Sequence, residues 1–153
     1  GDSRRQCTCT PTQVNRYRSR ISGPLLDRID IQVEVSNVDY EDLSSTENNE
    51  TSAEIKKRVN KTRKLQLERY KDYNIYSNSQ LDAGMLKKFC PLGEEENAIL
   101  RAAFDNLGLS ARAHSRILKV ARTIADLEGS ENIKSEHIAE AIQYRSLDRK
   151  YFE

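Results

Sequence analysis

The chain has 153 residues, of which 37% are hydrophobic and 32% are charged, and its formal net charge is +1. This length suits one ordinary domain, and a charge so near zero gives no overall attraction to nucleic acid or membranes. No apolar run approaches the roughly 20 residues that span a bilayer, and an odd count of three cysteines argues against a secreted disulfide framework, so we expect a cytoplasmic protein.

The N-terminal part predicts one helix and one strand. Thr10 suits a helix N-cap, Gln13 completes a capping box, and Gly23-Pro24 should end the helix near Ser22. Residues 28–35 then alternate apolar and polar side chains as a strand does. A single strand cannot satisfy its own backbone, and no other segment is a convincing partner, so we expect its sheet to lie in a longer protein.

The middle of the chain predicts a loop and a long helix. Residues 36–52 are polar and acidic, which is typical of a surface loop. The helix over 52–70 carries an apolar stripe on one side and basic residues from Lys56 to Lys64 on the other. That basic side could contact nucleic acid phosphates, but it has no interleaved aromatic residues, and a plain solvated face is favoured.

The second half predicts a compact unit of four helices. Ser79, Ser110 and Ser135 are the expected N-caps, while Gly108 and Gly129 are the expected helix ends. The helix after Ser110 has the clearest buried face, formed by Ala113, Ile117, Val120, Ala121, Ile124 and Leu127.

Two places in the sequence put arginine where phosphate chemistry could use it. Arg112 lies in a first helical turn, where free amides and the helix dipole favour an anion, and Arg116 and Lys119 follow at helical spacing. Their alternative is a solvated basic face. Arg28 follows two leucines after the Gly-Pro break and suits stabilisation of a phosphoryl group; its alternative is an exposed ion pair with Asp27 or Asp30.

The remaining chemical candidates are weaker. Cys7 and Cys9 form half a metal site at best, because zinc takes four ligands and Cys90 offers no suitable spacing. His137 is expected to be a surface residue in a first turn. The chain has no phosphate-binding loop, no G-x-S-x-G and no H-E-x-x-H, so we expect it to lack ATP hydrolysis on its own.

Two separated segments carry a family resemblance: "CTCTPTQVNRYRSRISGPLLDRIDIQVEV" and "LGLSARAHSRILKVARTIADLEGSENIKSEHIAEAIQYR". Together they resemble the C-terminal part of the magnesium chelatase-related AAA+ ATPases of the competence (ComM) type. The resemblance implies that Arg28 is an arginine finger acting on a neighbouring subunit and that Arg112, possibly with Arg116, contacts the nucleotide as sensor 2. It also makes Cys7 and Cys9 half of a four-cysteine cluster that could hold structural zinc.

The expected fold is therefore mainly α: a remnant of a P-loop AAA+ core, with one helix and one strand, followed by a helical-bundle lid. We expect the core remnant at 1–36, a loop and linking helix at 37–78, and the lid at 79–153.

By resemblance, the full-length protein would bind ATP and Mg²⁺, form a ring, and act on DNA by remodelling it or translocating along it, with no membrane partner. The alternatives are a chelatase subunit that drives metal insertion into a tetrapyrrole, and a non-enzymatic helical module that binds DNA or acts as an adaptor.

Overall fold

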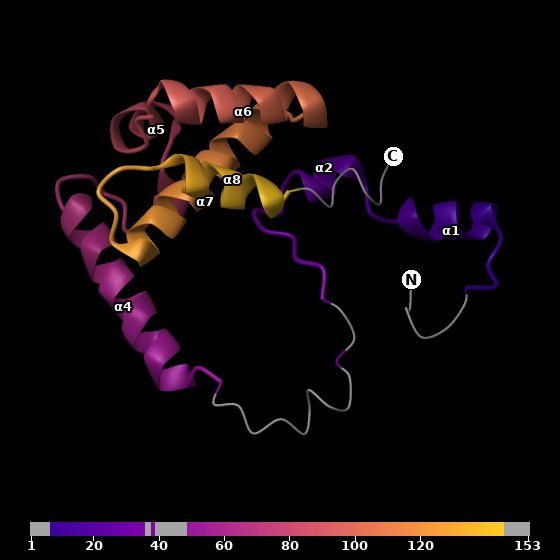
Figure 1. Ribbon diagram of the computed structural model, residues 1–153, viewed down its shortest axis with the longest axis horizontal. Coiled ribbons are helices and arrows are strands. Elements are labelled where there is room, and N and C mark those ends of the chain that lie inside the picture. The colour runs from indigo at the N-terminus through magenta and orange to yellow at the C-terminus, as the bar shows by residue number, and fades with distance from the viewer. Residues whose placement is uncertain (1–6, 36–37, 39–48, 146–153) are drawn as a thin grey trace.

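The computed structural model describes residues 7–35, 38 and 49–145, and these form a mainly helical molecule (Figure 1). The expected mainly α fold is thereby confirmed, while the AAA+ core remnant and the three-part domain division remain predictions. Within the described residues, no helix combines the length and apolar character needed to cross a bilayer. The elements in chain order are α1 (Pro11–Arg18), α2 (Gly23–Leu26), α4 (Ser52–Arg69), the 3-10 turn η1 (Asn78–Gln80), α5 (Ala83–Phe89), α6 (Glu94–Leu107), α7 (Ala111–Glu128) and α8 (Ser135–Gln143).

Helix α7 is the centre of the fold, and α4, α5, α8 and η1 all pack against it. Its buried face includes Ala113, Ile117 and Ala121, as its spacing predicts, whereas Leu127 remains exposed. Burial of such apolar side chains is the main stabilising contribution to a helical bundle. The other buried apolar residues of this core are Tyr70, Leu81, Leu86, Cys90, Leu100, Leu118, Ala125, Ile133, Ile138 and Ala141.

Local capping explains where several helices begin and end. The Thr10 and Gln13 capping box opens α1, and the Ser110 hydroxyl accepts a hydrogen bond from the Ala113 amide at the start of α7. Gly108 ends α6 with φ +59°, a left-handed conformation that a residue with a Cβ adopts only at a cost.

Two predicted N-caps are wrong. Ser79 lies inside η1, and Asp82 caps α5 instead, because its carboxylate accepts a hydrogen bond from a first-turn amide at 2.8 Å. Ser135 is the first residue of α8, whose N-cap is Lys134. The Ser135 hydroxyl donates to the Glu96 carboxylate at 2.9 Å, so its side chain joins α8 to α6.

The predicted N-terminal helix is shorter than expected. It ends at Arg18, and the Gly23-Pro24 pair opens a second short helix, α2, rather than only closing the first. Proline is favoured in a first helical turn because it has no amide to leave unsatisfied there.

The predicted strand over 28–35 is absent: none of these residues forms a strand in the described part of the chain. The physical reason is that no described segment lies beside it as a second strand, so a ladder of hydrogen bonds cannot form. Instead, the Gln32 amide donates to the Tyr144 carbonyl at 2.9 Å, which places this extended segment against the end of α8. Its apolar side chains Ile29, Ile31 and Val33 remain exposed.

A buried polar network joins α4 to α7. The Asp126 carboxylate accepts hydrogen bonds from the Arg69 guanidinium at 2.5 and 2.9 Å and from Arg122 Nε at 3.0 Å. Gln66 and Asn78 donate to the same carboxylate at 3.2 and 2.8 Å. This network holds α4 and η1 in a fixed position on α7.

Candidate functional site

Arg28 lies just after α2 and is exposed. The two acids that flank it are bound by other arginines, since Asp27 pairs with Arg145 at 3.4 Å and Asp30 pairs with Arg116. None of the described carboxylates forms an ion pair with Arg28. The alternative of an ion pair with its neighbouring aspartates therefore does not hold, and the Arg28 guanidinium remains available to an outside anion.

Arg112, Arg116 and Lys119 line one groove of about 400 Å³ at the start of α7. Arg112 is exposed, whereas Arg116 and Lys119 are half-buried, so this is more than a fully solvated basic face. The other lining residues are Asp30, Ser79, Ala111 and Ser115.

The groove has a positive electrostatic balance. Lys119 donates to the Ser79 carbonyl at 2.8 Å, and its pKa is lowered by burial and then by the nearby charge of Arg116. Three cations thus face one carboxylate, Asp30. A phosphate would gain from these cations and from the first-turn amides of α7.

Arg28 is not among the residues that line this groove. The described structure therefore presents two separate candidates, an exposed arginine after α2 and a cationic groove on α7. Their proposed roles in catalysis and nucleotide binding remain predictions.

The cysteines do not come together as a metal site in the described residues. Cys7 and Cys9 are exposed. Hydrogen bonds from the backbone amide and then the thiol of Cys9 lower the pKa of Cys7, and the hydrogen bond between the two thiols raises the pKa of Cys9. Cys90 is buried in the core, where burial raises its pKa to about 11 and disfavours the thiolate that a metal requires. Structural zinc at Cys7 and Cys9 remains a prediction.

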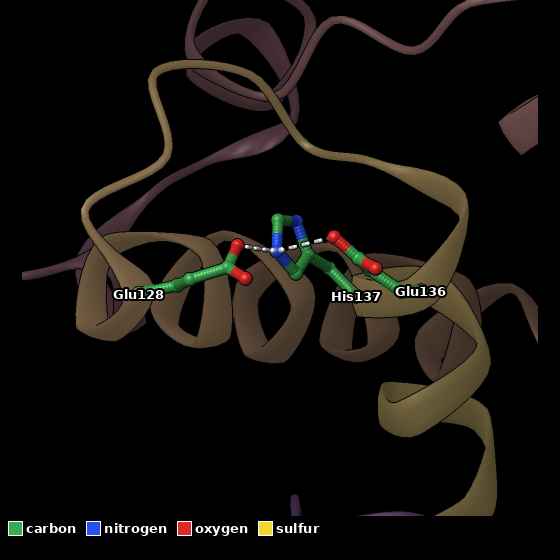
Figure 2. Close-up of side chains that lie close together, drawn as sticks. All are labelled: Glu128, Glu136 and His137. Carbon is green, nitrogen blue, oxygen red and sulfur yellow. Dashed lines mark hydrogen bonds and ion pairs between the residues drawn. The ribbon is translucent and has the colours of Figure 1, made fainter.

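A second cluster combines Glu128, Glu136 and His137 at the junction of α7 and α8 (Figure 2). His137 was expected on the surface, but this is wrong, since its side chain is only 3% exposed. Its Nδ1 accepts a hydrogen bond from the Lys134 amide at 3.0 Å, and its Nε2 lies 2.6 Å from the Glu128 carboxylate. This hydrogen bond lowers the pKa of Glu128.

The hydrogen bonds around His137 argue against a metal ion in this cluster. Because Nδ1 accepts, the ring proton of the neutral imidazole lies on Nε2, the nitrogen that faces the carboxylates and would have to bind the metal. The Lys134 ammonium also lies 3.0 Å from Glu136 and 3.6 Å from Glu128. The cluster is best explained as a junction that ties the end of α7 to the start of α8.

The family comparison agrees with the order of these features along the chain. A family model described as magnesium chelatase, subunit ChlI C-terminal, matches residues 49–145, which include every described helix from α4 to α8. The chain belongs to the magnesium chelatase ChlI family. A second model of this family, magnesium chelatase, subunit ChlI, matches residues 1–43 and thus includes Arg28.

This magnesium chelatase family member is similar to several longer proteins. It is 43% identical over 92% of its length to "Competence protein ComM" of Haemophilus influenzae and 42% identical over 92% to "Uncharacterized protein YifB" of Escherichia coli. It is 29% identical over 91% to "Uncharacterized protein Rv2897c" of Mycobacterium tuberculosis. The chain spans 27% of the length of each of these relatives, and it resembles the C-terminal part of a ComM-type protein.

The sequence pattern identified the three basic residues of the groove, but it gave no indication of the groove's acidic residue, Asp30. Asp30 lies 86 residues before Arg116, and no periodic pattern connects the two positions. It also missed the Asp126 network, although the spacing of Arg122 and Asp126 by one helical turn is a signal that could have indicated an ion pair.

Proposed function

We propose that the full-length protein is an AAA+ ATPase in which this chain supplies two arginines for hydrolysis of ATP. Arg28 acts in trans as the arginine finger, and Arg112 acts in cis as sensor 2. The observation that carries this proposal is the state of Arg28, which is exposed and unpaired among the described residues while both of its acidic neighbours bind other arginines. Family membership supports the ATPase class.

An exposed guanidinium can stabilise the charge that develops on the transferred phosphoryl group. Its planar, always protonated donors match phosphate oxygens in pairs. Arginine fingers are worth about 10³–10⁵ in rate, or roughly 4–7 kcal/mol of transition-state stabilisation. Because Arg28 does not line the α7 groove, it suits action on a nucleotide held by a neighbouring subunit, and hence self-association into a ring.

The groove on α7 supplies the nucleotide contact of the same subunit. Arg112 would bind a terminal phosphate of ATP, with Arg116 beside it, and the charge of bound Mg²⁺ would be balanced by groups outside this chain. Asp30 pairs with Arg116. A phosphate group therefore has to compete with a carboxylate for Arg116, whereas Arg112 has no such competitor within the described residues.

DNA is the substrate that we favour for the motor. The relative named a competence protein supports this choice, because competence is the capacity of bacteria to take up DNA. The family description equally supports a second function, in which the ATPase drives insertion of magnesium into a tetrapyrrole. Stimulation of ATP hydrolysis by DNA, compared with stimulation by a porphyrin and Mg²⁺, distinguishes the two.

The test of this proposal is ATPase activity of mixed full-length subunits. Arg28→Ala subunits should still bind ATP and should lower the activity of wild-type partners by more than dilution, because one defective finger disables a neighbouring site. Arg112→Ala should lower activity in proportion to its share of the mixture, with weakened nucleotide binding. Arg101→Ala, an exposed arginine on α6, is the matched control. Wild-type activity in both Arg28→Ala and Arg112→Ala would contradict the proposal.

A further inference from the structure

The outer surface of α4 carries an unusual excess of positive charge. Residues 52–69 contain seven Lys and Arg and two Glu, a net charge of +5, whereas the whole chain has a net charge of only +1. We propose that this helix binds the phosphate backbone of duplex DNA through a basic face. The basic face is defined as Lys56, Lys57, Lys61, Arg63 and Lys64, and all five are exposed.

The glutamates on and next to α4 bind residues outside the basic face. Glu54 accepts hydrogen bonds from Thr51 in the capping box at the start of α4, and Glu68 pairs with Lys71 at 2.6 Å. Glu50 binds Arg58, which lies outside the basic face. Within the described residues, no carboxylate forms an ion pair with any member of the basic face. An ordinary solvated helix gains stability from Glu–Lys ion pairs one turn apart, and no such ion pair forms on this face in the described structure.

The length of the basic face suits contact with a phosphate backbone. Lys57, Lys61 and Lys64 follow one line along the helix, and Lys56 and Arg63 follow a second line beside it. From Lys56 to Lys64 the helix rises by about 12 Å, and one DNA strand places a phosphate about every 3.4 Å along its axis. The face is therefore long enough for its cations to contact several phosphates of a duplex.

The absence of aromatic residues from α4 favours duplex DNA over single-stranded nucleic acid and over a protein partner. Proteins that bind single strands stack bases on aromatic side chains, and residues 52–69 contain no aromatic residue. Interfaces with other proteins are depleted of lysine and enriched in aromatic residues, which is the opposite of this composition. Contact with phosphates alone predicts binding without sequence preference.

The helix presents this face on a rigid support. Arg69 and Gln66, in its last turn and the turn before, bind the buried Asp126 carboxylate of α7. Figure 1 shows α4 at the edge of the molecule, with its N-terminal end pointing away from the other helices. The basic face is thus exposed along its length and fixed in direction relative to α7, the helix that carries Arg112.

This inference rests on the DNA substrate of the proposed function, and its first test is direct binding. The chain is titrated onto a short labelled duplex, and the dissociation constant is followed between about 50 and 200 mM salt. The variant Lys57→Gln/Lys61→Gln/Lys64→Gln should weaken binding at least about tenfold at low salt and reduce the slope of log K against log salt by about 2–3, because each lost phosphate contact removes about 0.9.

Two further variants make the result specific. Arg16→Gln/Lys87→Gln/Arg101→Gln removes the same charge from other exposed positions and should bind like wild type. Lys57→Arg/Lys61→Arg/Lys64→Arg keeps the charge and should retain both the affinity and the salt slope. Equal weakening in both Gln variants, or unchanged binding in the α4 Gln variant, would overturn the inference.

A second measurement separates failure of this inference from failure of the proposed function. In the full-length protein, DNA should stimulate ATP hydrolysis, and the α4 Gln variant should need a higher DNA concentration for the same stimulation while its activity without DNA is unchanged. If DNA stimulates ATP hydrolysis equally in the wild type and the α4 Gln variant, the inference about α4 fails, whereas the proposed DNA-dependent ATPase is retained. If DNA stimulates neither while ATP is hydrolysed, DNA is the wrong substrate and both the DNA assignment and this inference fail.

Discussion

The carboxylate of Asp126 is the centre of the buried polar network that joins α4 and η1 to α7. It is fully buried and accepts hydrogen bonds from two arginines, a glutamine and an asparagine. A buried carboxylate surrounded by so many donors compensates charges that would otherwise lie unpaired in the core.

Removal of that carboxylate should be costly. In Asp126→Ala, Arg69 and Arg122 lose their shared counter-charge, and we expect the free energy of unfolding to fall by about 3–5 kcal/mol. Urea denaturation measures this loss. Asp105→Ala, at an exposed position of α6, should change stability by no more than about 0.5 kcal/mol, and a similarly small effect of Asp126→Ala would show that the network contributes little.

The Cys90 thiol should make stability depend on pH in alkaline solution. Burial raises its pKa from 9.0 to about 11, so above pH 9 the unfolded chain loses this proton while the folded chain keeps it. Stability should therefore fall as pH rises between about 9 and 11, by about 2 kcal/mol more in the wild type than in Cys90→Ala. Chemical denaturation of both proteins across this range measures the difference; parallel curves would contradict the prediction.

Single residues also mark the limit of prediction from sequence. The arginines at 28 and 112 stand out by position alone, but the ion pairs of the residues around them depend on positions far away in the chain. Asp30 meets Arg116, and Asp27 meets Arg145, only because the fold brings them together. The burial of His137 was missed for the same reason, since its partner Glu128 belongs to the preceding helix.

At the scale of helices, prediction worked where the decisive contacts are local. The capping box of α1, the N-cap of α7 and the glycine ends of α6 and α7 involve residues within one turn, and all are as expected. The prediction of a strand over 28–35 was wrong because a strand needs a neighbouring strand, and none is present in the described residues. The prediction of Ser79 as an N-cap was wrong because Asp82, which follows three residues later, caps α5.

The left-handed end of α6 gives a clean test of a helix boundary. A Cβ added at Gly108 meets no atom within 4 Å, so Gly108→Ala should cost only the backbone strain of its φ of +59°, about 1 kcal/mol. Gly23→Ala is the matched control, since its surroundings are equally open and its φ is not positive. Thermal or urea unfolding should show a loss for Gly108→Ala alone; equal effects would remove the left-handed conformation as the cause.

At the scale of the whole molecule, the segment after α2 is attached to the helical unit by contacts with α7 and the end of α8. Arg145 is buried and donates to the Ile29 carbonyl at 2.7 Å and to Asp27, while the Gln32 amide binds the Tyr144 carbonyl. Arg28 lies within this attached segment. Its position relative to the groove on α7 therefore depends on residues near the end of α8.

Loss of the Arg145 contacts should release that segment. In Arg145→Ala, trypsin should cleave after Arg28 several-fold faster than in the wild type, because the flanking backbone opens more often. Mass spectrometry of early fragments measures this rate. Arg101→Ala is the control for the loss of one arginine, and an unchanged cleavage rate in Arg145→Ala would show that other contacts hold the segment.

The pairing of Asp27 with Arg145 and of Asp30 with Arg116 has an evolutionary consequence. Each ion pair joins positions more than 80 residues apart, so a change at one member leaves a charge at the other. Among relatives, substitutions at 27 should accompany substitutions at 145, and those at 30 should accompany those at 116. Position 28 should remain arginine whichever residues occupy the two pairs, since under the proposed function it acts on a neighbouring subunit.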